Sequence, residues 1–247
     1  MSTFTYLITG ASRSLGHGYA EALLRSSPSV RVVAAARKPD SASQLHKLVE
    51  EFGKDRVYLL KLDVTDKEGC EAAAKELESE DWLGDGGIDA LVNNAGVLQS
   101  PSLPSELEYD ELLGNMEVNI GGVLQVNKAF LPLVRKSRAK QIFGISSVCG
   151  SIGIYGSNTK FTAYSMTKTV LNMYLKKLSV ELADDGFTVI MFHPGYVKTE
   201  MNLKDGVQDG EIEIDEAVEA AVKNVFLRVK PEDNGRFLRY SGEEMPC

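Results

Sequence analysis

Tyr164 and Lys168 are the two residues whose types and spacing point most directly to chemistry. They stand four positions apart in Tyr164-Ser165-Met166-Thr167-Lys168, so a helix would place both side chains on one face. A tyrosine titrates at about 10, which is too high for ready proton transfer near neutral pH. A lysine charge about 4 Å away is worth roughly 4 kcal/mol at an effective dielectric of about 20, or about 3 pKa units. We therefore interpret Tyr164 as a proton donor for carbonyl reduction, with Lys168 lowering its pKa.

A second chemical signal lies in the glycine-bearing stretch Thr9-Gly10-Ala11-Ser12-Arg13-Ser14-Leu15-Gly16. It follows a predicted strand and opens a predicted helix. Glycines at such a place let the backbone turn tightly and approach a pyrophosphate, and the helix N-terminus supplies free N–H donors. The stretch therefore predicts a dinucleotide site. Ser14 adds a Cβ at a crowded position where φ can be positive, and a hydroxyl able to donate to a phosphate oxygen.

The end of the second predicted strand bears on which nicotinamide cofactor is used. It reads Ala34-Ala35-Ala36-Arg37-Lys38 and lacks the carboxylate that would bind the ribose hydroxyls of NAD. Arg37 lies just beyond the strand, and Arg13 of the glycine turn lies on the same side in such a fold. Arginine matches phosphate oxygens with a planar fork of donors. The two arginines predict NADP(H), the alternative being that both are solvated surface charges.

Short β-rich runs alternate with longer helical patterns along the chain. Strands are predicted over Thr5–Thr9, Val30–Ala36, Val57–Asp63, Ile88–Asn93, Gln141–Ser146, Thr188–His193 and Arg236–Arg239. Helices are predicted over Leu15–Ser26, Ser41–Phe52, Glu111–Arg135 and Ala163–Ala183, and another opens with the capping-box pattern Thr65-Asp66-Lys67-Glu68. Near-continuous apolar strands suit a parallel sheet that is buried on both faces. The alternation indicates an α/β, doubly wound (Rossmann-type) single domain over residues 1–247, with a cofactor half at about 1–145 and a catalytic and substrate half at about 146–247.

Composition excludes several classes of function. With 27 Lys and Arg against 35 Asp and Glu, the 247-residue chain has a net charge of −8, unlike a dedicated nucleic-acid binder. No apolar run approaches the roughly 18 residues that span a bilayer, and the start has no secretory-signal pattern. Cys70, Cys149 and Cys247 are odd in number and far apart, which favours a reducing compartment over a disulfide framework. We expect a cytoplasmic protein with no metal, membrane or nucleic-acid partner.

Five stretches in chain order resemble the motifs of one family. They are Thr9 to Gly16, Leu62-Asp63-Val64, Asn93-Asn94-Ala95-Gly96, Val118-Asn119-Ile120-Gly121 and Pro194-Gly195-Tyr196-Val197-Lys198-Thr199. Together they resemble the short-chain dehydrogenase/reductase family, with Ser14 in place of the middle glycine of the first turn. The resemblance implies that NADP(H) contacts Gly10, Ser12, Arg13, Ser14, Leu15, Gly16, Arg37, Asp63, Val64, Asn93, Ala95, Gly96, Tyr164, Lys168, Pro194, Gly195, Val197 and Thr199.

The same resemblance implies the remaining catalytic residues. Ser147, at the end of the fifth predicted strand, corresponds to the family's serine that hydrogen-bonds the substrate carbonyl, and Asn119 corresponds to an asparagine that fixes a water feeding protons to Lys168. Ser147 precedes Tyr164 by 17 residues, about four more than many members show, so Ser151, 13 residues before Tyr164, is the rival by spacing. We prefer Ser147 because a strand end gives rigid support. Around this site the chain is similar to the C-factor and sniffer-type carbonyl reductases.

Residues placed around the site predict the substrate class. Leu98, Cys149, Tyr155, Phe161, Tyr196 and Met201 would form a largely apolar pocket, with no Arg or Lys as a carboxylate clamp. The expected reaction is NADPH-dependent reduction of a neutral ketone, aldehyde or quinone of apolar or aromatic character. The alternative is an NADP(H)-binding regulatory or sensor protein with little turnover, and a third reading is a scaffold that binds no cofactor. The long apolar helices also predict a homodimer or homotetramer.

Overall fold

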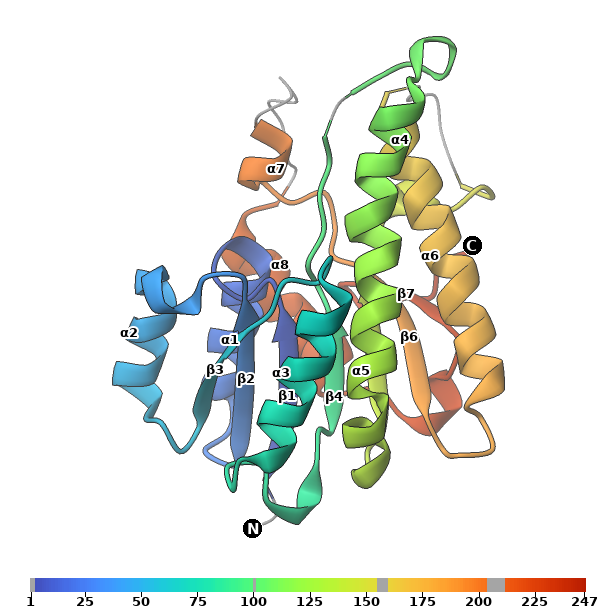
Figure 1. The fold of residues 1–247 in the computed structure, drawn as a ribbon. Helices are drawn as coiled ribbons and strands as arrows, with labels where there is room; N and C mark the ends of the chain where they lie inside the picture. Colours follow the sequence, from blue (N-terminus) through green and yellow to red (C-terminus); the bar gives the residue numbers. More distant parts are fainter. Residues whose placement is uncertain (1–2, 100, 155–159, 204–211) are drawn as a thin grey trace.

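Seven parallel strands form one sheet at the centre of the molecule. The computed structural model describes residues 3–99, 101–154, 160–203 and 212–247. The strands lie in the order β3-β2-β1-β4-β5-β6-β7 (Figure 1). Their bounds are Phe4–Thr9 (β1), Val30–Ala36 (β2), Val57–Lys61 (β3), Ala90–Asn93 (β4), Gln141–Ile145 (β5), Thr188–His193 (β6) and Phe237–Arg239 (β7). The order reverses between β1 and β4, which confirms the doubly wound fold and marks the point where such sheets bind ligands.

Helices cover both faces of the sheet. They are Ser14–Ser26 (α1), Ser43–Phe52 (α2), Lys67–Ser79 (α3), Tyr109–Met116 (α4), Val123–Lys136 (α5), Thr162–Glu181 (α6), Glu200–Leu203 (α7) and Ile214–Ala221 (α8). The apolar sides of α3, α5 and α6 pack on one face, and those of α1, α2 and α8 on the other. Figure 1 shows α3, α5 and α6 in front of the sheet.

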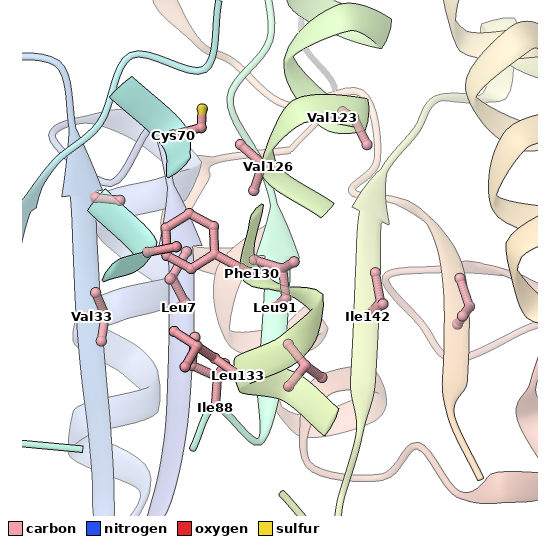
Figure 2. Close-up of a cluster of buried hydrophobic side chains, with 14 of the residues drawn as sticks. Leu7, Val33, Cys70, Ile88, Leu91, Val123, Val126, Phe130, Leu133 and Ile142 are labelled. Atoms are coloured by element: carbon pink, nitrogen blue, oxygen red, sulfur yellow. The ribbon is translucent and has the colours of Figure 1, made fainter. Parts of the chain in front are cut away.

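Alternate residues of each strand enter different cores, as the pleat of a strand requires. Leu7 of β1 and Leu91 of β4 face Phe130 of α5, as Figure 2 shows. Their neighbours Ile8 and Val92 belong to the core on the opposite face. Because both faces are covered, the strands are apolar along nearly their whole length.

Among the predicted boundaries that differ from the structure, the end of β3 and the start of α3 differ for clear local reasons. β3 ends at Lys61 rather than Asp63, because the Asp63 carboxylate accepts hydrogen bonds from the backbone N–H of Thr65 (3.0 Å) and its hydroxyl (2.8 Å), which turns the chain away. That contact also removes Thr65 from the predicted capping box. Asp66 caps α3 instead, accepting from the N–H of Gly69 at 3.0 Å.

The predicted helix Glu111–Arg135 is interrupted. α4 ends at Met116, a π-helical turn spans Glu117–Gly122, and α5 begins at Val123. A Cβ on Gly122 would lie 2.7 Å from a methyl of Val64, so the turn packs tightly against the segment that follows β3. Single π-helical turns are rare and frequently lie at functional sites. This one carries Asn119.

Candidate active site

The carboxyl ends of the strands border a cleft of about 590 Å³. In Figure 1 the strands run upward, and α7 lies above their ends. The segments after β1 and β4 leave in opposite directions, which opens a crevice between them. Most predicted cofactor-binding residues line this cleft: Gly10, Ser12, Arg13, Ser14, Leu15, Gly16, Arg37, Asp63, Val64, Ala95, Gly96, Tyr164, Lys168, Pro194, Gly195, Val197 and Thr199.

Close backbone packing shapes the glycine turn. Gly10 has φ +67°, and a Cβ on Gly16 would lie 2.4 Å from the carbonyl oxygen of Gly10. Asn94 holds the turn from below by donating to the carbonyl oxygen of Thr9 at 2.9 Å. Ser14 has φ +50°, so the strained backbone suspected there from the sequence is present. The turn therefore stays tightly packed although Ser14 stands in place of a glycine.

The two arginines predicted to select the cofactor have different surroundings. Arg13 forms an ion pair with Glu200 of α7 at 2.9 Å, and both side chains are about two-thirds exposed, at 65% and 67%. Arg37 lies near Asp63. Hydrogen bonds from Thr65, and more weakly the charge of Arg37, lower the pKa of the Asp63 carboxyl despite its partial burial. Both arginines border the same cleft, as the sequence indicated, but Arg13 has a carboxylate partner that the sequence did not reveal.

Tyr164 and Lys168 line the cleft, and Ser147 lies beside Tyr164 without itself lining it. The Lys168 ammonium lies 5.4 Å from the centre of the Tyr164 ring, and its Nζ donates to the carbonyl oxygen of Ile145 at 2.7 Å. The side chain of Ser147 lies close enough to the Tyr164 phenol to lower its pKa. The Ser147 hydroxyl also accepts from the N–H of Cys149 at 3.2 Å. Tyr164 thus lies near both Lys168 and Ser147.

Burial reverses one electrostatic expectation. It raises the pKa of Tyr164, and Cys149 raises it further, whereas the nearby side chain of Ser147 lowers it. Burial also lowers the pKa of Lys168 to about 8, against a smaller raising effect of Cys149. The prediction that Lys168 brings the pKa of Tyr164 toward neutrality is therefore wrong. The loss of water around both groups outweighs their mutual effect.

The structure distinguishes the two candidate serines. Ser151 is 1% exposed, and its hydroxyl donates to the carbonyl oxygen of Pro246 at 2.6 Å. Ser147 lies two residues beyond the end of β5 and is close to Tyr164. A Cβ on Gly150 would lie 2.7 Å from the backbone of Lys168, so the turn that carries Ser147 packs directly on α6. The geometry favours Ser147.

Asn119 is buried between the cleft wall and α6. Its side chain bonds both backbone groups of Val97, accepting from N–H at 2.8 Å and donating to the carbonyl oxygen at 2.9 Å. It does not itself line the cleft. The Asn119 side chain lies behind Gly96 and close to the Lys168 ammonium.

The predicted substrate residues are only partly brought together. Leu98 and Met201 line the cleft. Phe161 is buried with φ +65° at the start of α6, Cys149 is partly buried near Tyr164, and Tyr196 is 38% exposed. Tyr155 lies outside the described residues.

Asn93 departs from its predicted role in cofactor binding. Its side chain turns into the core and donates to Asn127 of α5 at 2.8 Å, so it does not border the cleft. The reason is the alternation along β4, which points residue 93 toward α5 and leaves the next residue, Asn94, at the cleft.

A model of the short chain dehydrogenase family matches residues 5–209. The chain belongs to this family. An oxidoreductase of Schizosaccharomyces pombe whose activity is uncharacterised is 35% identical, over 98% of this chain and 97% of the relative. The carbonyl reductase Sniffer of Drosophila melanogaster has a TM-score of 0.89 at 25% identity, with full coverage of both chains. An NADPH-bound carbonyl reductase from chicken fatty liver has a TM-score of 0.87 at 29% identity, over 100% of this chain and 95% of that one. These similarities confirm the resemblance to the family and to its carbonyl reductase branch.

Several residues that line the cleft of this short-chain dehydrogenase were not among the predicted site residues. They are Ala36, Leu62, Thr65, Asn94, Val97, Glu117, Val118, Ile145, Ser146 and Glu200. Asn94 stands inside the matched Asn-Asn-Ala-Gly stretch, and Glu200 directly follows the matched Thr199, so adjacency to a motif was the available signal. Glu117 and Val118 reach the cleft from the π-helical turn, for which the sequence has no clear signature.

In the described part of this dehydrogenase, no helix combines the length and apolar character needed to cross a bilayer. The same residues include no cluster of three or more His, Cys, Asp or Glu side chains arranged to hold a metal ion.

Stability of the dehydrogenase is expected to fall as the pH decreases below about 6.5. His193 is 7% exposed, accepts from the N–H of Val148 at 3.3 Å, and has its pKa lowered from 6.5 to about 4 by burial and by Arg239. The unfolded chain therefore binds the proton more tightly, so this stability is complete above the unfolded pKa and is lost toward pH 4. The loss at pH 5 is about 2 kcal/mol.

Urea unfolding at pH 7.5 and 5.0 measures this loss. His193→Asn, which keeps an acceptor for Val148, serves as the control and should show a pH dependence about 2 kcal/mol smaller. An identical pH dependence in both proteins would show that His193 is not the group responsible.

Proposed function

We propose that this chain is an NADPH-dependent carbonyl reductase that acts on a ketone, aldehyde or quinone of apolar or aromatic character, with Tyr164 as the proton donor. The observation that carries the proposal is the placement of Tyr164 and Lys168 in a cleft also lined by the glycine turn and Arg37, with Ser147 beside the Tyr164 phenol. The similarity to two carbonyl reductases, one of them NADPH-bound, supports both the reaction and the cofactor.

The cleft fits a dinucleotide on its own geometry. The side of the turn that faces Asn94 and Ala95 has no room for further atoms: a Cβ on Gly10 would lie 3.1 Å from Cα of Ala95. The first backbone N–H groups of α1 are available to a ligand, because the side chain of the N-cap residue Arg13 makes no capping hydrogen bond within the described residues. Gly10, Ser12, Ser14 and Gly16 would hold the pyrophosphate, and Arg37 and Arg13 the 2′-phosphate. When bound, NADPH supplies the hydride.

Ser147 and Tyr164 are placed to act on the substrate oxygen. Both hydroxyls can donate to a carbonyl that enters beside Leu98 and Met201, and such preorganised donors stabilise the oxyanion as it forms. The raised pKa of Tyr164 keeps its phenol protonated, as a donor requires. An alkoxide is a stronger base than a phenolate, so proton transfer from Tyr164 remains favourable. Lys168, with a pKa of about 8, is mostly charged at neutral pH and stabilises the phenolate left behind.

Replacing Arg37 with alanine is expected to weaken NADPH binding by about 10- to 150-fold while NADH binding stays nearly unchanged. A hydrogen bond between charged groups is worth about 1.5 to 3 kcal/mol, and only NADPH carries the 2′-phosphate. Fluorescence titration with each cofactor measures the change. Ala36→Asp should go further, because its carboxylate repels the phosphate and accepts from the ribose hydroxyls.

The matched control for Arg37 is Arg138, a cation remote from the cleft whose replacement by alanine should alter neither affinity. Added salt should weaken NADPH binding more than NADH binding. Equal affinity of the wild type for NADH and NADPH, unchanged in Arg37→Ala, would make the arginines surface charges and the cofactor assignment wrong.

Oxidation of NADPH in the presence of aromatic diketones, quinones and aldehydes tests the proposed activity. We expect turnover with at least one of these classes and little with charged 2-oxo acids, since the described lining offers apolar contacts at Leu98 and Met201. Tight NADPH binding with no turnover on any carbonyl would contradict the proposal and favour a regulatory role.

We also propose a cytoplasmic protein that forms a homodimer or homotetramer. Apolar side chains are exposed along the outer surfaces of α4 and α6, which lie side by side in Figure 1. On α6 they recur at helical spacing, with Met166, Val170 and Met173 exposed by 43%, 41% and 60%. Such a stripe is typical of an interface between copies. Light scattering at micromolar concentration should give a multiple of the 27.0 kDa chain mass, and a clean monomer would contradict the assembly.

A further inference from the structure

Thr167 is a fully buried threonine of α6, one position before Lys168, that has no part in the mechanism above. Its hydroxyl donates to the carbonyl oxygen of Tyr164 at 2.7 Å and accepts from Nδ2 of Asn119 at 3.0 Å. A hydroxyl has a single proton to donate. Because that proton goes to Tyr164, the amide of Asn119 must be the donor in the second contact.

The Asn119 amide is held from two sides. Its two bonds to the backbone of Val97 determine which way the amide oxygen points. Among the described residues, the bond to Thr167 is the hydrogen bond that ties this amide to α6, and so to the turn bearing Tyr164 and Lys168. The amide donates both protons, to Val97 and Thr167, and its oxygen retains one unused lone pair.

That amide oxygen shares a small space with the Lys168 ammonium. A Cβ added to Gly96 would lie 3.2 Å from Oδ1 of Asn119 and 3.8 Å from Nζ of Lys168. The ammonium donates to Ile145 and has further protons to place. The separation between the amide oxygen and the ammonium therefore depends on how Asn119 is tied to α6.

We propose that Thr167 is a positioning residue, which holds Asn119 in register with Tyr164 and Lys168 so that the amide oxygen faces the ammonium. The inference rests on the proposed function, since its readout is turnover. Without the Thr167 hydroxyl, one N–H of a buried amide lacks its acceptor, and such groups are costly to leave unpaired. Asn119 then moves to find another partner and leaves Lys168.

Two substitutions separate the hydroxyl from the shape of the side chain. Thr167→Val keeps the branched shape and removes the hydroxyl, whereas Thr167→Ser keeps the hydroxyl. We expect kcat to fall about tenfold or more in Thr167→Val, with KM and the NADPH Kd within about threefold of wild type, and kcat in Thr167→Ser within about threefold.

Thr169 offers a matched control on the same helix. Its hydroxyl makes a similar bond to the backbone, donating to Ser165 at 3.0 Å, away from Asn119. Thr169→Val should keep kcat within about threefold of wild type. A double-mutant cycle completes the test: because Thr167 acts through Asn119, adding Thr167→Val to Asn119→Ala should cause less than twofold further loss.

The outcomes separate this inference from the proposed function. A wild type that reduces no carbonyl overturns the proposed function and the inference with it. An active wild type with normal kcat in Thr167→Val, or equal losses in the Val and Ser variants, or a similar loss in Thr169→Val, overturns the inference alone. If Thr167→Val fails to fold, Thr167→Ala removes the same hydroxyl without adding bulk, and its kcat decides in the same way.

Discussion

Carbonyl reduction is expected to fall at least about a hundredfold when Tyr164 is replaced by phenylalanine, the usual scale for loss of a general acid. The variant removes the phenol and keeps the ring, which lies 5.4 Å from the Lys168 ammonium. NADPH binding should change little, because the other cleft residues remain. Steady-state NADPH oxidation, with titration of NADPH by fluorescence, measures both effects.

Tyr174 provides a matched control for this variant. It lies on the same helix, but its hydroxyl accepts from Asn127 at 3.2 Å, remote from the cleft. Tyr174→Phe should therefore stay within about threefold of wild-type turnover. If Tyr164→Phe retained turnover within a few-fold of wild type, the phenol would not be the proton donor and the mechanism would have to be abandoned.

A similarly large effect is expected for Ser147→Ala, with kcat lowered by about 10²- to 10³-fold, the scale for removing an oxyanion donor. Ser147 lies two residues beyond the rigid end of β5 and is close to the Tyr164 phenol. Ser151→Ala should retain turnover within about threefold and lose only stability, about 1 kcal/mol, because the Ser151 hydroxyl bonds the backbone at Pro246.

Kinetics and urea unfolding on both variants distinguish the two roles. Folded Ser147→Ala should have lost most of its turnover, whereas Ser151→Ala should stay active with reduced stability. The opposite ranking of activities would mean that the 13-residue spacing to Tyr164 identifies the catalytic serine better than its place at a strand end.

The sheet and the order of its elements were predictable because strands that are buried on both faces are apolar along nearly their whole length. Val30–Ala36 and Thr188–His193 were predicted with the same bounds that the structure has. Both are central enough to be covered on two faces, so the apolar run coincides with the strand. Strand ends next to polar turns were less accurate, as at Asp63, where side-chain hydrogen bonds compete with the ladder.

Local rules failed where a distant segment decides the conformation. The helix predicted over Glu111–Arg135 has suitable periodicity throughout, but the π-helical turn packs against Val64 and lets Asn119 reach Val97. Asn93 and Asn94 belong to the same motif. The alternation of side chains along β4 places Asn93 in the core and leaves Asn94 at the cleft.

The fold, the family and the chemical groups of the site could be predicted because they depend on periodicity, on residue type and on motifs placed at strand ends. What each group does depends on contacts between segments that are distant in the chain. Tertiary structure joined Arg13 to Glu200, turned Ser151 toward Pro246, and tied Asn119 to Thr167. It also reversed the expected pKa of Tyr164, since burial removes the water that favours a charged form, and no spacing along the chain reports how much water folding will exclude.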